Sequence, residues 1–387
     1  MGESGSRRCV ALVSDCYLPN MGGIEMQTHD LARNLAARGH EVVVVTSTPG
    51  PDEVEGVRVH RLAPAGNKRL PGFHFALPLA TSVFDELRQV LADEDVDVAH
   101  FHGGVGSPLA FIGASNAQAD GVPSVVTTHC LWSYAAPGFR LVEQRYHWTQ
   151  WPVVFSAVSQ VAAAPMRRLA GPDVDVVVLP NGIDRDEWVV EPEPQDPDVF
   201  TVVSVMRLAM RKRPLQLVRL LRHVRDGLAP DRRLHAVIVG EGPQRHLIER
   251  LIAAEGMDDS IELTGRLGRP AIRQLYARAG AFVAPANLES FGIAALEARC
   301  AGVPVVAKAH TGVVEFVEHG REGLLGTSDK DLARQLVRLG RDVELRDAMA
   351  KHNLDTAPAM DWDDVVERNL AAYSRAIDLM ADRGPFT

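Results

Sequence analysis

The chain alternates short apolar runs rich in β-branched residues with longer amphipathic stretches, and this alternation limits the fold more than any other feature. A strand buried on both faces is continuously apolar, and consecutive parallel strands need a crossover helix between them. The sequence therefore predicts an α/β protein with doubly wound, largely parallel sheets. The expected strands of the first half are Cys9–Ser14, Glu41–Thr46, Val57–Arg61, Val96–Phe101, Ser124–Thr128, Val153–Ser159 and Val174–Leu179. Those of the second half are Phe200–Met206, Leu234–Gly240, Ser260–Thr264, Ala281–Ala284 and Val303–Ala307.

An acidic, proline-rich segment separates these two halves. Residues 191–198 read Glu-Pro-Glu-Pro-Gln-Asp-Pro-Asp, a composition that forms neither a helix nor a central strand. A chain of 387 residues also exceeds one ordinary domain. We therefore expect one Rossmann-like domain over residues 1–190 and a second over 199–363. The stretch Asp361–Met380 has the spacing of an amphipathic helix.

Composition excludes several classes of protein. Apolar residues make up 46% and charged residues 24%, as in a globular protein, and charged residues or proline interrupt every apolar run before the roughly 18 residues of a spanning helix. The first eight residues lack the apolar core of a secretion signal, so we expect a cytoplasmic protein. The net charge of −9 argues against nucleic-acid binding. The four cysteines have neither disulfide-framework nor zinc-site spacing.

Two glutamates bracket the segment that follows the expected strand Ala281–Ala284. Glu289 and Glu297 are the ends of the run Glu-Ser-Phe-Gly-Ile-Ala-Ala-Leu-Glu. This segment would lie at the carboxyl edge of the second sheet, where open α/β sheets bind ligands and a helix N-terminus attracts phosphate. A glutamate on a helix is usually solvated, but the apolar neighbours of Glu297 predict a buried helix, in which an unpaired carboxylate is costly.

A basic element follows the first expected strand of the second half. Residues 207–212 read Arg-Leu-Ala-Met-Arg-Lys, and Arg213 and Arg219 lie close by in the sequence. The cations belong either to a solvated helix start or to the site of a bound anion. Because cations at a helix N-terminus oppose the helix dipole, the anion site is the favoured interpretation.

Together, these segments resemble the signatures of retaining glycosyltransferases of the family-4 type. That family has the GT-B architecture, in which two Rossmann-like domains face each other across a cleft and a C-terminal helix, here about 364–387, crosses back to the first domain. The resemblance extends from Pro19 to Trp362 and is closest to the branch that adds N-acetylglucosamine to phosphatidylinositol and to related bacterial enzymes. Two positions depart from the family pattern: Arg213 replaces the usual glycine after the lysine, and Ala309–Gly312 replaces a Gly-Gly element.

The resemblance implies a role for each of these residues. Arg207 and Lys212 would clamp the diphosphate of a nucleotide-sugar donor, Glu289 would face the donor sugar, and Glu297 would bind the ribose hydroxyls. The remaining donor contacts would come from Ser290, Phe291, Gly292 and Ile293. No tightly bound cofactor is expected, and a divalent metal is not strictly required.

The first half contains two further segments that match the family. Gly22 and Gly23 join the first strand to the first helix, where glycine lets backbone amides approach a ligand, and they fit the family's Pro-x-x-Gly-Gly-x-Glu loop. His129 stands at the family's Thr-x-His position, next to the donor sugar. A histidine after a strand is otherwise more often structural. With Arg207, Lys212 and Glu289 it completes the expected catalytic set.

A metal site is not expected. Residues 97–102 read Asp-Val-Ala-His-Phe-His and superficially resemble a set of metal ligands. The family has a structural histidine in this strand, so the resemblance implies a structural role for these side chains.

We therefore expect a retaining glycosyltransferase that moves a hexosyl or N-acetylhexosaminyl unit to a hydroxyl acceptor such as an inositol, an aminocyclitol or a glycolipid. UDP-sugar is the favoured donor. A mannosyltransferase that uses GDP-mannose on a lipid, a nucleotide-sugar epimerase of the same fold and a non-catalytic sensor are the alternatives.

The acceptor is left open by the sequence. A lipid acceptor would bring the protein into peripheral contact with the inner membrane face, through Lys68, Arg69, Phe73 and Phe75 or through Arg140, Arg145, Trp148 and Trp151. A soluble acceptor would favour acidic groups near the Gly-Gly loop, for which the candidates are Asp15, Glu25 and Asp30. The oligomeric state is also left open.

Overall fold

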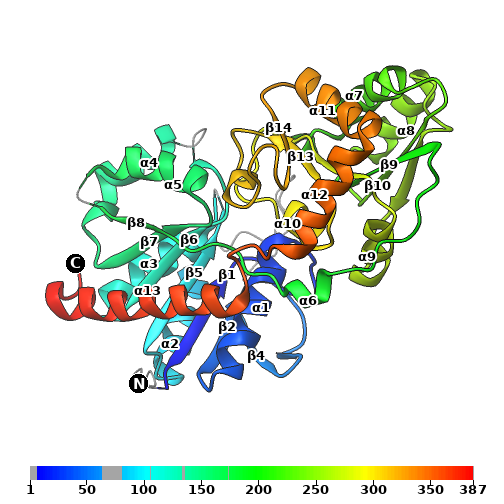
Figure 1. Cartoon of the computed structure of the whole chain (residues 1–387). Helices are drawn as coiled ribbons and strands as arrows, with labels where there is room; N and C mark the ends of the chain where they lie inside the picture. The colour runs from blue at the N-terminus through cyan, green and yellow to red at the C-terminus, as the bar shows by residue number, and fades with distance from the viewer. Residues whose placement is uncertain (1–6, 63–80, 105, 133–135, 173, 387) are drawn as a thin grey trace. The chain divides into compact units, whose positions relative to one another are not determined.

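The chain folds into two compact α/β units, each built on one sheet (Figure 1). The structure is a computed structural model that describes residues 7–62, 81–104, 106–132, 136–172 and 174–386. Unit 1 comprises Met1–Gly182 and Trp362–Thr387, and unit 2 comprises Ile183–Asp361. The predicted fold class, two doubly wound units with parallel sheets, is confirmed.

The sheet of unit 1 has the strand order β3-β4-β2-β1-β5-β6-β7-β8. All its strand pairs are parallel except β3–β4. The central strands β1, β5 and β6 are buried along their whole length, as their continuous apolar runs predict. The strands are β1 (Cys9–Ser14), β2 (Glu41–Thr46), β3 (Glu53–Val54), β4 (Val57–Arg61), β5 (Val98–Gly103), β6 (Ser124–Thr128), β7 (Val153–Ala157) and β8 (Val176–Val178).

Helices cover both faces of this sheet. The helices of unit 1 are α1 (Gly23–Ala37), α2 (Thr81–Asp93), α3 (Pro108–Ala119), α4 (Ala136–Tyr146), α5 (Gln160–Ala170) and α13 (Trp362–Arg383), with a short 3-10 helix η2 at Trp148–Gln150. Both α3 and α13 pack on β5 and β6, which are therefore covered on both sides. The core joins β1, β2, β5 and β6 to α1 and α13.

The last helix, α13, returns the chain from unit 2 to unit 1. Figure 1 shows it in red along the strands of unit 1. Tyr373 is fully buried, and its hydroxyl lies 2.9 Å from Nδ1 of His100 on β5. Arg8 donates to Ser374 at 2.9 Å. In the part of the chain that the structure describes, neither this helix nor another has the length and hydropathy of a membrane-spanning segment.

Unit 2 has a six-stranded sheet with the order β11-β10-β9-β12-β13-β14, and every pair is parallel. The strands are β9 (Val199–Val205), β10 (Arg233–Val239), β11 (Ile261–Gly265), β12 (Ala281–Ala284), β13 (Val305–Lys308) and β14 (Gly323–Gly326). The helices are α6 (Arg185–Trp188), α7 (Pro214–Gly227), α8 (Arg245–Ala254), α9 (Arg269–Ala277), α10 (Ile293–Cys300), α11 (Asp329–Arg341) and α12 (Val343–Asp355), with 3-10 helices η3 (Met210–Lys212) and η4 (Gly312–Glu315).

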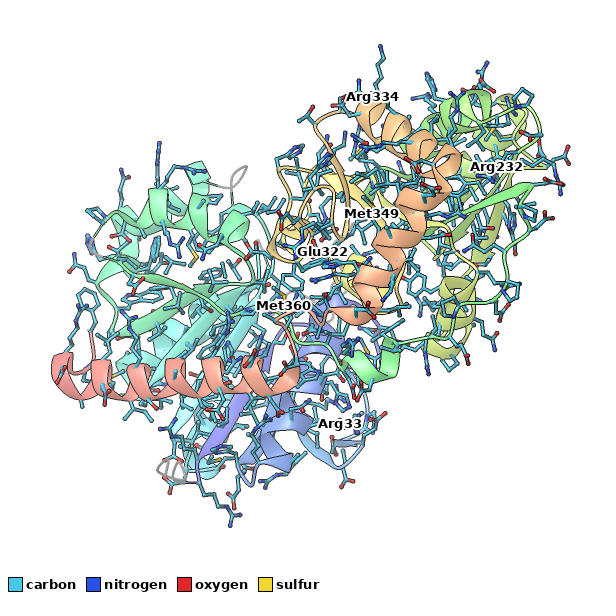
Figure 2. All side chains as sticks on the ribbon, viewed as in Figure 1. Arg33, Arg232, Glu322, Arg334, Met349 and Met360 are labelled. Carbon is cyan, nitrogen blue, oxygen red and sulfur yellow. The ribbon has the colours of Figure 1, made fainter. Side chains whose placement is uncertain are left out.

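A buried ionic contact joins the edge strand of unit 2 to its helices. Glu322 precedes β14 and lies 2.9 Å from His352 of α12 and 3.6 Å from Arg299 of α10. Figure 2 labels Glu322 and, on α12, Met349. The sequence did not predict β14, because its residues Gly-Leu-Leu-Gly lack the β-branched side chains typical of strands.

The division between the units differs from the expected one. We placed the first connection in residues 191–198 and the second at about 363/364, whereas the structure divides the chain at 182/183 and at 361/362. The proline-rich segment is attached to unit 2, because Glu193 N donates to the carbonyl of Ala277 and Gln195 Nε2 to that of Ala279. Ile183 forms a parallel bridge with Asp361, so the two connections between the units lie side by side.

Replacement of Tyr373 by phenylalanine should destabilise unit 1. His100 is buried, and burial lowers its pKa to about 3, so the ring is neutral and needs one donor and one acceptor. Thr127 contacts Nε2 at 2.6 Å, and loss of the Tyr373 hydroxyl leaves Nδ1 unpaired. We expect a loss of about 1–3 kcal/mol in unfolding free energy.

Urea titration followed by tryptophan fluorescence would measure this loss. Four of the five tryptophans, residues 132, 148, 151 and 362, belong to unit 1. Tyr146→Phe is the matched control, since this tyrosine is 54% exposed and its replacement should change stability by less than about 0.5 kcal/mol. Equal stability of the two variants would contradict the proposed attachment of α13.

Candidate functional site

The carboxyl ends of β9 and β12 bring together two of the expected site residues. These strands are neighbours in the sheet of unit 2. Lys212 lies in η3 after β9, and Glu289 lies in the loop after β12. Lys212 Nζ is 2.5 Å from Glu289 Oε2, and the two side chains are only 26% and 15% exposed. The structure therefore pairs a predicted phosphate-binding cation with a predicted sugar-binding carboxylate.

The amino end of α10 lies directly after Glu289. Gly292 precedes the helix with a φ of 101°, a left-handed conformation that favours glycine. Phe291 is buried against Phe316, with ring centroids 5.4 Å apart, and Ser290 and Ile293 are half-buried. The first backbone N–H groups of a helix have no acceptor within the helix, so this end of α10 can bind an anion.

Close backbone packing shapes the loop between Glu289 and Gly292. Gly312 N donates to the carbonyl of Glu289 at 2.9 Å. A Cβ on Gly312 would lie 2.0 Å from the carbonyl oxygen of Ser290, so only glycine fits there. The departure from the family's Gly-Gly element at 309–312 thus keeps the glycine that the packing requires.

Glu297 lies one turn into α10 and is half-buried. Its neighbours Ala295, Leu296 and Ala298 are buried, as expected, whereas Glu297 is only partly buried. The hydroxyl of Tyr276 donates to the carbonyl of Ala294 at 3.2 Å, and burial together with the charge of Glu297 raises the pKa of Tyr276.

Arg207 is exposed at the end of β9, in a loop held firmly by its neighbours. Leu208 N donates to the carbonyl of Glu241, and Leu208 in turn accepts from Gln244 N. A Cβ on Gly240 would lie 1.9 Å from the carbonyl oxygen of Met206. The glycines after β10 therefore allow two loops to pack closely at the carboxyl edge of the sheet.

Sequence reasoning missed Asp329, the first residue of α11. It lies 2.8 Å from Nζ of Lys308, a lysine that is 2% exposed, and 2.7 Å from Nη1 and Nη2 of Arg213. The sequence signal was present, but an aspartate after Ser328 at a helix start is an ordinary N-terminal residue. Its two cationic partners lie 21 and 116 residues away.

Unit 1 presents the Gly-Gly loop at the start of α1. Gly22 caps the helix in an extended conformation, and a Cβ there would lie 2.4 Å from Oε2 of Glu25. Gly23 is exposed. The Glu25 carboxylate thus folds back over Gly22, and a larger residue would displace it.

His129 follows β6 and belongs to a group of three histidines. Its Nε2 lies 3.1 Å from Nδ1 of His102, and the ring of His102 lies 4.0 Å from that of His100. Burial lowers the pKa of His129 to about 4 and the pKa of His102 well below its usual value. These rings are therefore neutral at physiological pH and act as hydrogen-bonding groups.

The same three histidines line a small pocket of unit 1, together with Gln27, Asn369 and several apolar side chains. Within the described residues, His102 Nε2 and Asn369 Oδ1 have no hydrogen-bond partner. Among the described residues, no group of three or more His, Cys, Asp or Glu is placed to hold a metal ion.

Asp15 follows β1 and is 1% exposed. Its Oδ1 accepts from Leu109 N of α3 at 3.3 Å, while Oδ2 has no partner among the described residues. Burial raises the pKa of this carboxyl from 3.8 to about 7. Asp15 therefore keeps its proton to a higher pH than an ordinary aspartate.

The two described aromatic candidates for a membrane-facing patch are buried. Trp148 and Trp151 are 3% and 6% exposed, so their inclusion in an exposed patch was wrong. Trp148 packs against Trp132 and Phe155 in the core. Arg140 and Arg145 of α4 are exposed. The other candidates, Lys68, Arg69, Phe73 and Phe75, lie outside the described residues.

Comparison with known proteins identifies relatives over nearly the whole chain. The model of Glycosyltransferase Family 4 matches residues 21–187, and the model of Glycosyl transferases group 1 matches residues 186–354. The chain is 27% identical to one component of the human phosphatidylinositol N-acetylglucosaminyltransferase, over 95% of this chain and 76% of the relative. It is 29% identical to the D-inositol 3-phosphate glycosyltransferase of Pseudarthrobacter chlorophenolicus, over 92% and 91%.

The fold is similar to that of solved structures. The crystal structure of Anabaena HepE in complex with UDP and glucose has a TM-score of 0.76 at 19% identity, covering 95% of this chain and all of the other.

Replacement of Asp15 by asparagine should remove a pH-dependent loss of stability. Because the pKa is higher in the folded state, the folded protein binds more protons between about pH 4 and 7, so this group destabilises the fold as pH rises through that window. Between pH 5 and pH 8, we expect the unfolding free energy of wild type to fall by about 2–3 kcal/mol relative to that of Asp15→Asn. Urea titration across this pH range, with the exposed Asp231→Asn as control, measures the difference. If the difference in unfolding free energy between wild type and Asp15→Asn does not change with pH, the raised pKa is contradicted.

Proposed function

This chain is a glycosyltransferase of the family-4 type with the GT-B fold, and on that premise we propose that it is a retaining enzyme that uses a nucleotide-diphosphate sugar. We propose a hexosyl or N-acetylhexosaminyl unit as the transferred group and an inositol-type hydroxyl as the acceptor. The names of the two relatives support this acceptor class, since one acts on phosphatidylinositol and the other on inositol 3-phosphate.

The observation that carries the proposal is the contact of Lys212 with Glu289 beside the amino end of α10. The diphosphate would lie against Lys212, Arg207 and the amino end of α10, because all three favour an anion. Glu289, released from Lys212 by the phosphate, would accept hydrogen bonds from the donor sugar. Glu297, half-buried one turn further along, would accept those of the ribose.

The chemical step would gain from fixed cations. As the bond between the sugar carbon and the phosphate oxygen breaks, negative charge grows on the departing diphosphate, and Arg207 and Lys212 stabilise it. The acceptor oxygen forms its bond to the same carbon on the same face, and its proton passes to the departing phosphate oxygen. This step needs neither a protein nucleophile nor a tightly bound cofactor, and the protein cations can do the work of a metal.

Unit 1 would bind the acceptor. The Gly-Gly loop offers backbone amides, and the neutral imidazole of His129 can donate or accept a hydrogen bond that positions the donor sugar next to the acceptor. If the acceptor is a lipid, the enzyme would work at the inner face of the membrane.

The first test is a donor panel. The purified protein, without acceptor, would be mixed with UDP-, GDP- and dTDP-sugars, and binding would be followed by calorimetry together with release of nucleotide. We expect one donor class to bind and to be hydrolysed slowly, because the site stabilises the departing diphosphate. UDP-sugars come first, since HepE binds UDP. If no donor binds, the proposed function is wrong.

Two substitutions should separate binding from turnover. Glu297→Ala should weaken nucleotide affinity about tenfold, because the ribose loses a charged acceptor. Arg207→Ala should lower turnover by about one to two orders of magnitude with less effect on binding, because its cation opposes charge that develops during the reaction. Calorimetry and steady-state kinetics measure these effects, with Glu249→Ala on the exposed face of α8 as control. Equal nucleotide affinity of wild type and Glu297→Ala would remove the ribose assignment.

A further inference from the structure

Arg213 has a backbone conformation that its side chain does not favour. It follows Lys212 directly, and its φ and ψ of 60° and 44° lie in the left-handed region. Residues with a Cβ rarely adopt this conformation, and glycine adopts it readily. The family usually has glycine at this position, so the presence of arginine here needs an explanation.

The Arg213 guanidinium connects three segments of unit 2. It makes a two-pronged contact with the Asp329 carboxylate, 2.7 Å from each nitrogen. It also donates to the carbonyl of Pro285 and to Oδ1 of Asn287, both at 3.1 Å. The backbone of Arg213 thus ends the loop after β9, while its side chain binds the loop after β12 and the start of α11.

These contacts lie beside the Lys212–Glu289 pair. Lys212 is the preceding residue, and Asn287 is two residues before Glu289. A planar guanidinium with several fixed donors restrains both loops at once, which a flexible lysine would do less well. Arg213 therefore fixes the distance between the loops that carry the two site residues.

The contact between Arg213 and Asp329 is stronger than an ordinary surface ion pair. The two side chains are 20% and 37% exposed, the contact is two-pronged, and the buried Lys308 binds the same carboxylate. The left-handed backbone opposes the arginine at the same time. Glycine would relieve this strain, so what arginine adds at position 213 is the restraint of the loops.

We propose that Arg213 is a positioning residue for the donor diphosphate, anchored by Asp329. This inference rests on the proposed function of the Lys212–Glu289 site. By holding the two loops together, Arg213 orients Lys212 toward the phosphates. It acts through Lys212 and leaves the nucleoside part of the site to Glu297.

The test compares Arg213→Gly with wild type. Glycine fits the left-handed backbone, so the variant should fold, and its melting temperature should stay within a few degrees of wild type. Calorimetry would measure affinity for UDP and for uridine, or for GDP and guanosine if the donor panel selects GDP-sugars. We expect affinity for the diphosphate to fall about tenfold or more and affinity for the nucleoside to change less than about twofold. The KM for the donor should rise accordingly.

Two further variants separate positioning from other effects. Arg213→Lys keeps the charge and loses the planar donors, so its diphosphate affinity should fall between those of wild type and Arg213→Gly. Arg232→Met is the matched control. Arg232 is labelled in Figure 2 and precedes β10, so it lies at the amino-terminal ends of the strands, away from the candidate site. It donates to the carbonyls of Pro197 and Gly340. Its loss should leave both affinities unchanged.

The outcomes distinguish this inference from the proposed function. If wild type binds neither diphosphate nor nucleoside, the proposed function fails. If wild type binds both and Arg213→Gly binds the diphosphate equally well, or loses both ligands equally, positioning by Arg213 is overturned. Wild-type affinity in Arg213→Lys would also overturn it, because the charge alone would then suffice.

Discussion

The parallel pairing of β9 with β12 is the constraint on which the candidate site depends. Ala281 pairs with Val202 and Phe282 with Val203, so the two strands end at the same edge of the sheet. Lys212 and Glu289 are 77 residues apart in the chain and meet only because of this register. A one-residue slip would turn the side chains of β12 to the opposite face and misplace the loop that follows it.

Close packing of loops then fixes the geometry at this edge. Gly240 and Gly312 let one backbone approach another at distances that exclude a Cβ, and Gly292 supplies a positive φ at the start of α10. Glycine gives space and conformational freedom but makes no side-chain contact. Arg213 departs from this pattern, since it accepts an unfavourable backbone in exchange for contacts to two other segments. Rigidity at the site therefore comes from tight backbone packing together with one multiply bonded side chain.

The sequence predicted the fold well because its signals are local. Buried parallel strands are apolar throughout, and this pattern located twelve strands of the structure, while the two that it missed are the short edge strands β3 and β14. Of the residues that a family motif marked, the structure brings Lys212 and Glu289 into contact. Asp329 was missed because its role arises from residues distant in the chain, and its local pattern is that of a helix start. The partial burial of Glu297 and the burial of Trp148 likewise depend on packing between distant elements.

The two units differ in the charged groups at the carboxyl edges of their sheets, and this difference indicates which part of the ligand each unit would bind. In unit 2 the carboxyl edge of the sheet has Arg207, Lys212 and a helix amino end, which favour a phosphate, together with the carboxylates Glu289 and Glu297. In unit 1 the corresponding edge has His129, held neutral by burial, and Asp15, whose pKa is about 7. A neutral imidazole does not attract a diphosphate, but it hydrogen bonds well to hydroxyls. The charged part of a nucleotide sugar is thus expected to be held by unit 2. Unit 1 is suited to bind the hydroxyl groups of the sugar and of the acceptor.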